Sequence, residues 1–410
     1  MNKEVSLQSE KTSILKDIKN ILLILISGIS TKLGNVFFNV GLNLWILQSS
    51  GNTLTLGIIS SLGLIPTLVF TLLGGVISDS YNKKYVIVIC DVLAGLMSLV
   101  LAFMIDNDTV DIFYITTFMV IMSVIRSLFN PAIRALPAYT VSEDNRGHAN
   151  SLLNISAQAV QVAGPVISSA IIFLIGLNIR TILLIKGTTL LMSALVEIFI
   201  EMKFDDKSDK TDASKASMLN KLTNGWTYLY QHKDMMGVVL LASLSNIFIA
   251  GYNLYLPFYA NYVNNNSLYG MLLSLEAAGG IIGSLMILFI PRFKENSDIS
   301  IYLLICGIIF LPIFLIPNLY IIGASIFLFG LFLTIFNVNF FTYLQNKVEK
   351  EFIGRVISIT TVAALLLMPL GQVVFSFMMD FVGINSLPLI GVGICMVCSV
   401  IMLKFKKVHL

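Results

Sequence analysis

Long apolar segments recur along the whole chain and limit what it can fold into. Each is close to the about 20 residues that an α-helix needs to cross the roughly 30 Å hydrocarbon core of a bilayer. The chain is 56% hydrophobic and only 12% charged, more apolar than a water-soluble fold can bury. The sequence therefore predicts an all-α integral membrane protein with twelve transmembrane helices. The predicted spans are 20–47, 53–78, 85–106, 112–134, 150–176, 180–202, 236–262, 267–291, 299–316, 319–345, 355–381 and 386–404.

The basic residues indicate the orientation of these spans. Of 26 Lys and Arg, three lie within spans, Arg180 lies on one face, and the other 22 lie on the face that carries both termini. Because cytoplasmic loops are enriched in Lys and Arg, both ends and the long central loop are predicted to be cytoplasmic. We expect a multi-pass protein of a cell membrane, whose small net charge of +3 reflects topology and not nucleic-acid binding.

The sequence carries no pattern typical of an enzyme. It has no GxxxxGK phosphate loop, so we do not expect ATP to drive the protein. The histidines, at 148, 232 and 409, are too scattered for a metal site. Cys395 and Cys398 form a CxxC on an apolar helix, where we interpret them as small packing residues. We therefore expect neither a cofactor nor a bound metal.

The two halves of the chain repeat each other. An offset of 207 residues carries Asn130 onto Asn337 and Gly164 onto Gly371. This predicts two pseudo-symmetric six-helix bundles, with the substrate site between them near the bilayer midplane. The predicted parts are a cytoplasmic segment 1–19, a bundle 20–202, a linker 203–235 with an amphipathic helix, a bundle 236–404 and a tail 405–410.

Polar side chains line one face of the first span. Lys32, Asn35, Asn39 and Asn43 fall within a stripe about 80° wide at 100° per residue. Because a charge inside hydrocarbon is costly, we expect Lys32 to face a cavity or a charged partner. The other predicted cavity residues are Asn154, Gln158, Asn246, Asn253, Glu276 and Asn337.

Glu276 lies near the middle of the eighth span and is the carboxylate best placed to couple transport to protons. Our hypothesis is that Glu276 binds a proton or a cationic substrate, with Lys32 as its partner or competitor. The alternative is that Glu276 only neutralises Lys32. In the sixth span we interpret Lys186 and, near the cytoplasmic end, Glu197 and Glu201 as mainly structural.

A polar hinge at residues 74–84, Gly-Gly-Val-Ile-Ser-Asp-Ser-Tyr-Asn-Lys-Lys, joins the second and third spans. It resembles the corresponding loop of the major facilitator superfamily, with Asn82 where Gly is usual. Asn tolerates a positive φ, so we expect the tight turn to be retained. Asp79 is predicted to face the free N–H groups that open the eleventh span. The predicted inner gate and latch residues are Gly75, Asp79, Lys83, Lys84, Asp91, Arg126, Gly354 and Arg355.

The fifth span contains Gly164-Pro165, which suits a gating helix. It resembles the fifth-helix motif of the antiporters in the superfamily, although Ser168 and Ser169 replace the usual final glycines. The whole chain resembles the bacterial branch that holds macrolide-efflux and siderophore-exporter proteins. The resemblance implies export of an amphipathic small molecule, driven by a proton gradient, by a monomer in lipid. Uptake, facilitated diffusion or lipid flipping on the same fold is the alternative, and a sensor or assembly factor without transport is a third class.

Overall fold

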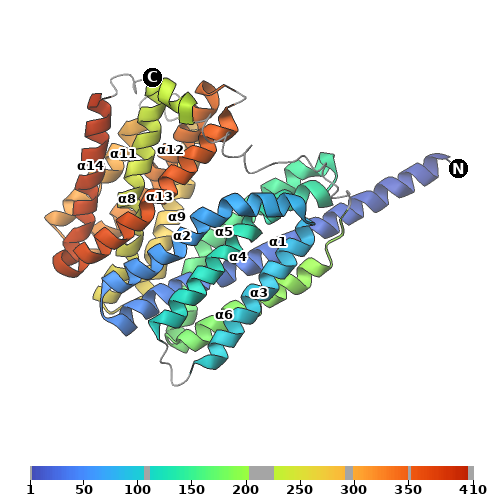
Figure 1. The fold of residues 1–410 in the computed structure, drawn as a ribbon, viewed down its shortest axis with the longest axis horizontal. Coiled ribbons are helices and arrows are strands. Elements are labelled where there is room, and N and C mark those ends of the chain that lie inside the picture. Colours follow the sequence, from blue (N-terminus) through green and yellow to red (C-terminus); the bar gives the residue numbers. More distant parts are fainter. Residues whose placement is uncertain (1, 106–110, 203–225, 291–298, 350–351, 405–410) are drawn as a thin grey trace. The chain divides into compact units, whose positions relative to one another are not determined.

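The described chain is built of long α-helices (Figure 1). The computed structural model describes residues 2–105, 111–202, 226–290, 299–349 and 352–404, and no β-strand occurs in these ranges. The helices are α1 (Asn2–Ser50), α2 (Thr53–Ser80), α3 (Lys83–Met104), α4 (Ile112–Thr140), α5 (Glu143–Ile175), α6 (Ile179–Ile198), α8 (Lys233–Tyr262), α9 (Asn266–Phe289), α11 (Ile299–Ile308), α12 (Leu319–Lys347), α13 (Ile353–Val382) and α14 (Ser386–Lys404).

Each of the twelve predicted spans overlaps one of these helices, which confirms the all-α membrane fold. Within the described residues, nine segments are long and apolar enough to cross a bilayer, and one of them, Ile359–Ile401, runs through both α13 and α14. The segments Thr53–Thr67 of α2 and Ile299–Phe314 are shorter apolar helices. The latter joins α11 to a 3₁₀ turn, Leu311–Phe314, where Pro312 cannot supply a backbone donor.

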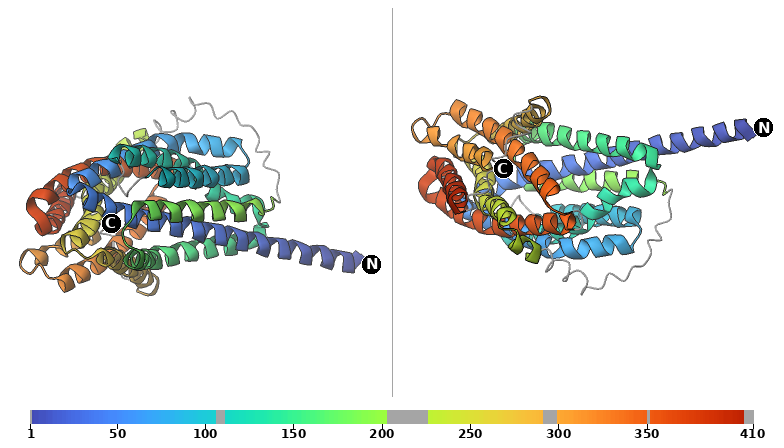
Figure 2. Two further views of the ribbon diagram at one scale, coloured as in Figure 1. Left: turned by 90° about the horizontal axis from the view of Figure 1, so that it is seen from below. Right: turned by 90° about the horizontal axis from the view of Figure 1, so that it is seen from above.

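The chain divides into two compact units. Unit 1 comprises 1–42 and 66–212, and unit 2 comprises 43–65 and 213–410. The last two turns of α1 and the first half of α2 thus belong to unit 2. Most of the linker predicted at 203–235 lies outside the described residues, so the predicted domain borders stay predictions. The segment 1–19 is helical from Asn2 onward, as the first part of α1, and Figure 2 shows it extending past the other helices of unit 1.

Small residues bring the helices of unit 1 together around α6. A Cβ on Gly95 of α3 would lie 3.1 Å from the carbonyl oxygen of Gly187 on α6, and one on Gly187 would lie 3.0 Å from that of Gly95. On α1, a Cβ at Gly34 would collide with Thr189 of α6. Since neither contact tolerates a larger side chain, α6 is fixed between α1 and α3. This contact also fixes Lys186, the residue before Gly187.

Unit 2 contains a closer contact, between α9 and α12. A Cβ on Gly279 or Gly283 of α9 would collide with the backbone of Phe327 or Leu331. On α12, a Cβ at Gly330 would collide with the backbone carbonyl of Glu276. The two backbones therefore touch, and the position of Glu276 is set by the glycines around it.

The predicted tight turn between α2 and α3 is retained, since α2 ends at Ser80 and α3 begins at Lys83, but it does not use a positive φ at Asn82. Asn82 has φ −61°, not a positive φ, and its side chain accepts a hydrogen bond from Lys84 N as the N-cap of α3. The prediction that Asn82 replaces glycine at a left-handed position was wrong. An asparagine side chain satisfies a free N–H at a helix start, and that geometry requires only extended backbone.

Candidate functional site

Glu276 on α9 is half-buried and accepts a hydrogen bond from Tyr252 on α8, with 3.0 Å between Tyr252 Oη and Glu276 Oε2. Tyr252 is fully buried, and its ring packs against Phe329 and Phe310 at centroid distances of 4.3 and 5.7 Å. No Lys, Arg or His within the described ranges forms an ion pair with Glu276. The carboxyl therefore lies in an apolar setting with one fixed donor.

Asn43, the last residue of the predicted polar stripe, lies in unit 2 with Glu276. Its Nδ2 donates to Tyr269 Oη at 3.0 Å, and buried Tyr269 lies close enough to Glu276 to interact with it electrostatically. The structure thus brings together two predicted cavity residues through two tyrosines that sequence reasoning missed. With 14 tyrosines in the chain, no sequence signal singled out Tyr252 and Tyr269.

The other predicted cavity residues of unit 2 make few contacts. Asn246 is half-buried and its Nδ2 donates to Ala242 O of its own helix at 2.7 Å. Asn253 and Asn337 are exposed and form no side-chain hydrogen bond with any described residue. Their amides are free to meet a ligand.

In unit 1, the rest of the polar stripe is accessible. Lys32 and Asn39 are exposed and Asn35 is half-buried, and none of the three has a hydrogen-bond partner in the described part of the chain. On α5, Asn154 and Gln158 are exposed in the same way. Lys32 and Glu276 lie in different units, so their predicted pairing stays a prediction.

The predicted gating pair on α5 is buried. A Cβ on Gly164 would meet Val36 Cγ1 of α1 at 3.1 Å, so glycine permits a close approach of α5 to α1. Pro165 follows within a helix that continues from Glu143 to Ile175. The proline removes one backbone hydrogen bond without ending the helix.

Asp91 and Glu197 form a buried carboxyl pair in unit 1. Thr31 Oγ1 lies 2.9 Å from Asp91 Oδ2 and 2.7 Å from Ser193 Oγ, and Ser193 Oγ lies 3.3 Å from Glu197 Oε1. Both carboxyls are almost inaccessible, and Glu197 Oε2 has no hydrogen-bond partner among the described residues. Asp91, predicted as a gate residue, thus contacts α1 and α6 through hydroxyls. Glu197 was interpreted as structural, although a carboxyl in an apolar span was itself a signal.

Lys186 on α6 is a deeply buried cation, with 4% of its surface exposed. Its Nζ lies 3.6 Å from the centroid of Phe38 and 5.4 Å from that of Phe118. Arg126 on α4 is near enough to repel it. Arg126 itself is exposed and contacts no carboxylate among the described residues.

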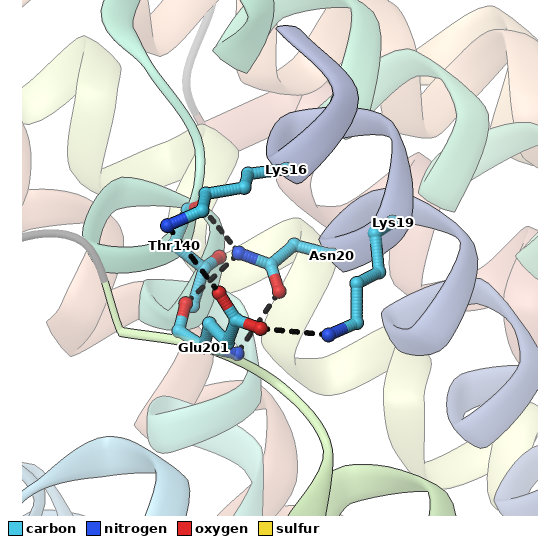
Figure 3. Close-up of polar contacts among 5 residues, drawn as sticks. All are labelled: Lys16, Lys19, Asn20, Thr140 and Glu201. Atoms are coloured by element: carbon cyan, nitrogen blue, oxygen red, sulfur yellow. Dashed lines mark hydrogen bonds and ion pairs between the residues drawn. The ribbon is translucent and has the colours of Figure 1, made fainter. Parts of the chain in front are cut away.

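A hydrogen-bonded cluster ties the N-terminal part of α1 to the ends of α4 and α6 (Figure 3). Asn20 Nδ2 donates to the carbonyl oxygens of Thr140 and Glu201, both at 2.8 Å, and Glu201 N donates to Asn20 Oδ1 at 3.0 Å. Lys19 Nζ lies 2.7 Å from Glu201 Oε1, and this ammonium lowers the pKa of the exposed Glu201 carboxyl. These contacts hold helix ends together and leave no open donor set for a ligand.

Half of the predicted gate and latch residues lie outside the described side chains, namely Gly75, Asp79, Gly354 and Arg355. Of the others, Lys83 is buried with Nζ 4.7 Å from the Tyr139 ring centroid, and Lys84 is half-buried. The latch therefore stays a prediction.

At the opposite end of α2, unit 2 contains a contact that sequence reasoning missed. Asp380 on α13 accepts hydrogen bonds from Thr53 N at 2.8 Å and Leu54 N at 3.2 Å, so it caps α2 from another helix. Ser61 Oγ, two turns along α2, lies 3.0 Å from Pro369 O and 3.2 Å from Gln372 Oε1 of α13.

Within the described residues, no group of three or more His, Cys, Asp or Glu could hold a metal ion. The four cysteines are free, and Cys395 and Cys398 do not form a disulfide.

Comparison with known proteins agrees with this architecture. A profile described as Major Facilitator Superfamily matches residues 22–372. Macrolide efflux protein A of Streptococcus pyogenes is 22% identical over 366 residues, covering 87% of this chain and 88% of that protein. The staphyloferrin A transporter of Staphylococcus aureus (strain NCTC 8325 / PS 47) is 24% identical over 386 residues, covering 92% and 94%. The crystal structure of the nucleoside transporter NupG matches with a TM-score of 0.71 at 14% identity, covering 95% of this chain and 98% of that one.

Proposed function

Because the chain belongs to the major facilitator superfamily, whose members transport small molecules across membranes, we propose that it exports an amphipathic compound by exchange with protons. The compound is drug-like or siderophore-like. The names of two relatives, a macrolide efflux protein and a staphyloferrin A transporter, support this substrate class. We place the protein in a bacterial plasma membrane as a monomer with both termini in the cytoplasm.

The contact between Tyr252 and Glu276 is the observation that carries proton coupling. A carboxyl at membrane depth without a cation is costly when ionised, so binding and releasing a proton changes its energy strongly. Tyr252 holds one oxygen of the carboxyl, and the Glu276 side chain is only half-buried. Lys32 is the proposed partner or competitor for this carboxyl. The amides of the stripe and of Asn246, Asn253 and Asn337 are proposed to meet the substrate.

Alternating access requires contacts that form at one end of the helices and break at the other. We propose that Asp79 faces the start of α13 at the cytoplasmic end. Asp380 caps the start of α2 at the opposite end. The carboxylate of Asp79, near the end of α2, and that of Asp380, near the end of α13, would then stabilise opposite states of the transport cycle.

The test is efflux of a panel of dyes and antibiotics, macrolides included, from pump-deficient cells. Cells express the wild type, Glu276→Gln or Asp79→Asn, with and without a protonophore. We expect the protonophore and both substitutions to abolish efflux of at least one compound. Glu143→Gln is the matched control, because the Glu143 side chain is 84% exposed on a helix end and pairs only with its neighbour Arg146.

Two results would contradict the proposal. Normal efflux by Glu276→Gln under an imposed pH gradient would remove Glu276 from coupling. If no compound leaves faster than from empty cells, drug export is excluded, and uptake or lipid flipping by the same fold becomes the function to test.

A further inference from the structure

The predicted spans of unit 1 contain side chains of both charges, and in the described residues the cations do not pair with the carboxyls. Lys32, Arg126 and Lys186 are cations, whereas Asp91 and Glu197 are carboxyls. No ion pair joins either carboxyl to a cation in the part of the chain that the structure describes. Charges at membrane depth usually pair with one another or serve a substrate. Here the pairing within unit 1 is missing.

Lys186 shows the imbalance most clearly. Its ammonium lies over the face of Phe38, and Phe38 and Phe118 meet edge to face at 5.7 Å. A cation–π contact attracts the ammonium but leaves its charge without a counter-ion. A nine-tenths buried cation without an acidic partner leaves positive potential in the bundle.

Arg126 is the accessible group beside this buried charge. It lies eleven residues after Ile115 and eleven before Pro137, so both are about 20° away around α4. Ile115 and Pro137 are both buried, so Arg126 lies on the packed face of α4. Its own side chain is nevertheless exposed. Its guanidinium donors have no partner among the described residues. Half-buried Met122, one turn earlier, supplies apolar surface next to it.

The carboxyls of unit 1 that could have served these cations are engaged elsewhere. Asp91 and Glu197 meet Thr31 and Ser193, and Glu201 meets Lys19. A planar guanidinium with free donors matches a carboxylate in a bidentate geometry.

We propose that Arg126 binds the carboxylate of an amphipathic organic anion, with the buried charge of Lys186 strengthening the site. The inference rests on the proposed transport function, because this anion is then the cargo. It narrows the substrate class from amphipathic compounds in general to acidic ones.

The test measures binding and needs no transport. The full-length protein is purified in lipid nanodiscs, and its unfolding temperature is titrated with 4-phenylbutyrate or with its uncharged isostere 4-phenylbutyramide. We expect the carboxylate to raise the unfolding temperature saturably and the amide to leave it unchanged. Because a charge-assisted contact weakens with salt, the apparent affinity should also fall as NaCl is raised.

Variants identify the site. Arg126→Gln should weaken phenylbutyrate binding at least tenfold, Arg126→Lys should weaken it less, and Lys186→Gln should weaken it several-fold without abolishing it. Arg180→Gln, which removes an exposed arginine at the start of α6, should bind like the wild type. Arg126→Lys keeps the charge, so its partial binding separates the bidentate contact from a folding defect.

Either of two results would overturn the proposal: phenylbutyrate fails to stabilise the wild type, or it binds Arg126→Gln as tightly as the wild type. Efflux and binding can fail separately. A protein that binds the carboxylate but exports nothing contradicts the proposed export, whereas efflux of neutral or cationic compounds without carboxylate binding contradicts only this site.

Discussion

The side chains of Tyr252 and Glu276 are hydrogen-bonded to each other, across α8 and α9, and to no other described residue. The Tyr252 side chain is fully buried, so water cannot replace Glu276 as the acceptor of its hydroxyl group. A buried donor with a single acceptor fixes the rotamer of that acceptor. The pair therefore determines which oxygen of Glu276 remains available.

Tyr252→Phe should destabilise the protein by about 1–3 kcal/mol, because it leaves one carboxyl oxygen without its donor. The measurement is thermal unfolding in nanodiscs. Tyr320→Phe is the control, since Tyr320 is 84% exposed and should change stability by less than about 0.5 kcal/mol. Equal stability of the two variants would show that the Tyr252 contact does not hold the carboxyl.

Gly330→Ala should destabilise the protein by about 1–3 kcal/mol and impair transport, because the new methyl group would collide with the backbone of Glu276. Gly28→Ala is the matched control. A Cβ at Gly28 meets nothing within 4 Å, so alanine there should be neutral or stabilising by about 0.5–1 kcal/mol. Unfolding temperature and efflux are measured for both. A neutral Gly330→Ala would mean that α9 and α12 separate at little cost.

The helices could be predicted from the sequence, but the contacts that position the site residues could not. Long apolar runs fix the spans because the bilayer demands internally hydrogen-bonded segments of set length. The polar stripe from Lys32 to Asn43 was visible as periodicity. The division of this stripe between the two units, after Leu42, could not be predicted, because no residue type marks that point.

Other features depend on tertiary partners. Asp380 caps a helix more than 300 residues away, and no local pattern reveals such a cap. At Asn82 the local prediction was wrong, because side-chain capping satisfied the turn without a positive φ. Lys186 and Glu197 carried a usable signal, since each is a charge in an apolar span, but only the structure shows that they do not pair.

Asp380→Asn should loosen the contact between α13 and the start of α2, because a charged acceptor of two backbone donors becomes neutral. The expected cost is about 1 kcal/mol. The readout is the labelling rate of Thr53→Cys by a membrane-impermeant maleimide, which should rise in the Asp380→Asn background. Asp111→Asn is the control, because Asp111 caps its own helix α4 through Phe113 N. An unchanged labelling rate would show that Asp380 does not close this end.

The Lys19–Glu201 contact should give a stability difference that depends on pH. Lys19 lowers the pKa of Glu201 below its ordinary value, so the ionised carboxylate is favoured in the folded state. The contribution is complete above the unfolded pKa of about 4.3 and disappears as pH falls through the lowered folded value. Unfolding temperatures of the wild type and Glu201→Gln should therefore differ at neutral pH and converge in acid. Lys19→Gln should reproduce this profile, and a constant difference down to acid pH would assign the effect to packing.

Glu197→Gln should leave stability unchanged or raise it, whereas Asp91→Leu should lower it by about 1–3 kcal/mol. Two carboxyls that share the hydroxyls of Thr31 and Ser193 repel each other when both are ionised, and the described residues supply no cation to offset this. Glutamine removes that repulsion while keeping nearly the size of glutamate and an oxygen that can accept from Ser193. Leucine at 91 instead removes the carboxylate acceptor of Thr31, which then has only Ser193 Oγ within hydrogen-bond distance among the described residues. Thermal unfolding of the two variants measures this difference. Strong destabilisation by Glu197→Gln would mean that an ionised Glu197 is needed to hold α6, and that the two carboxyls do not act as a repelling pair.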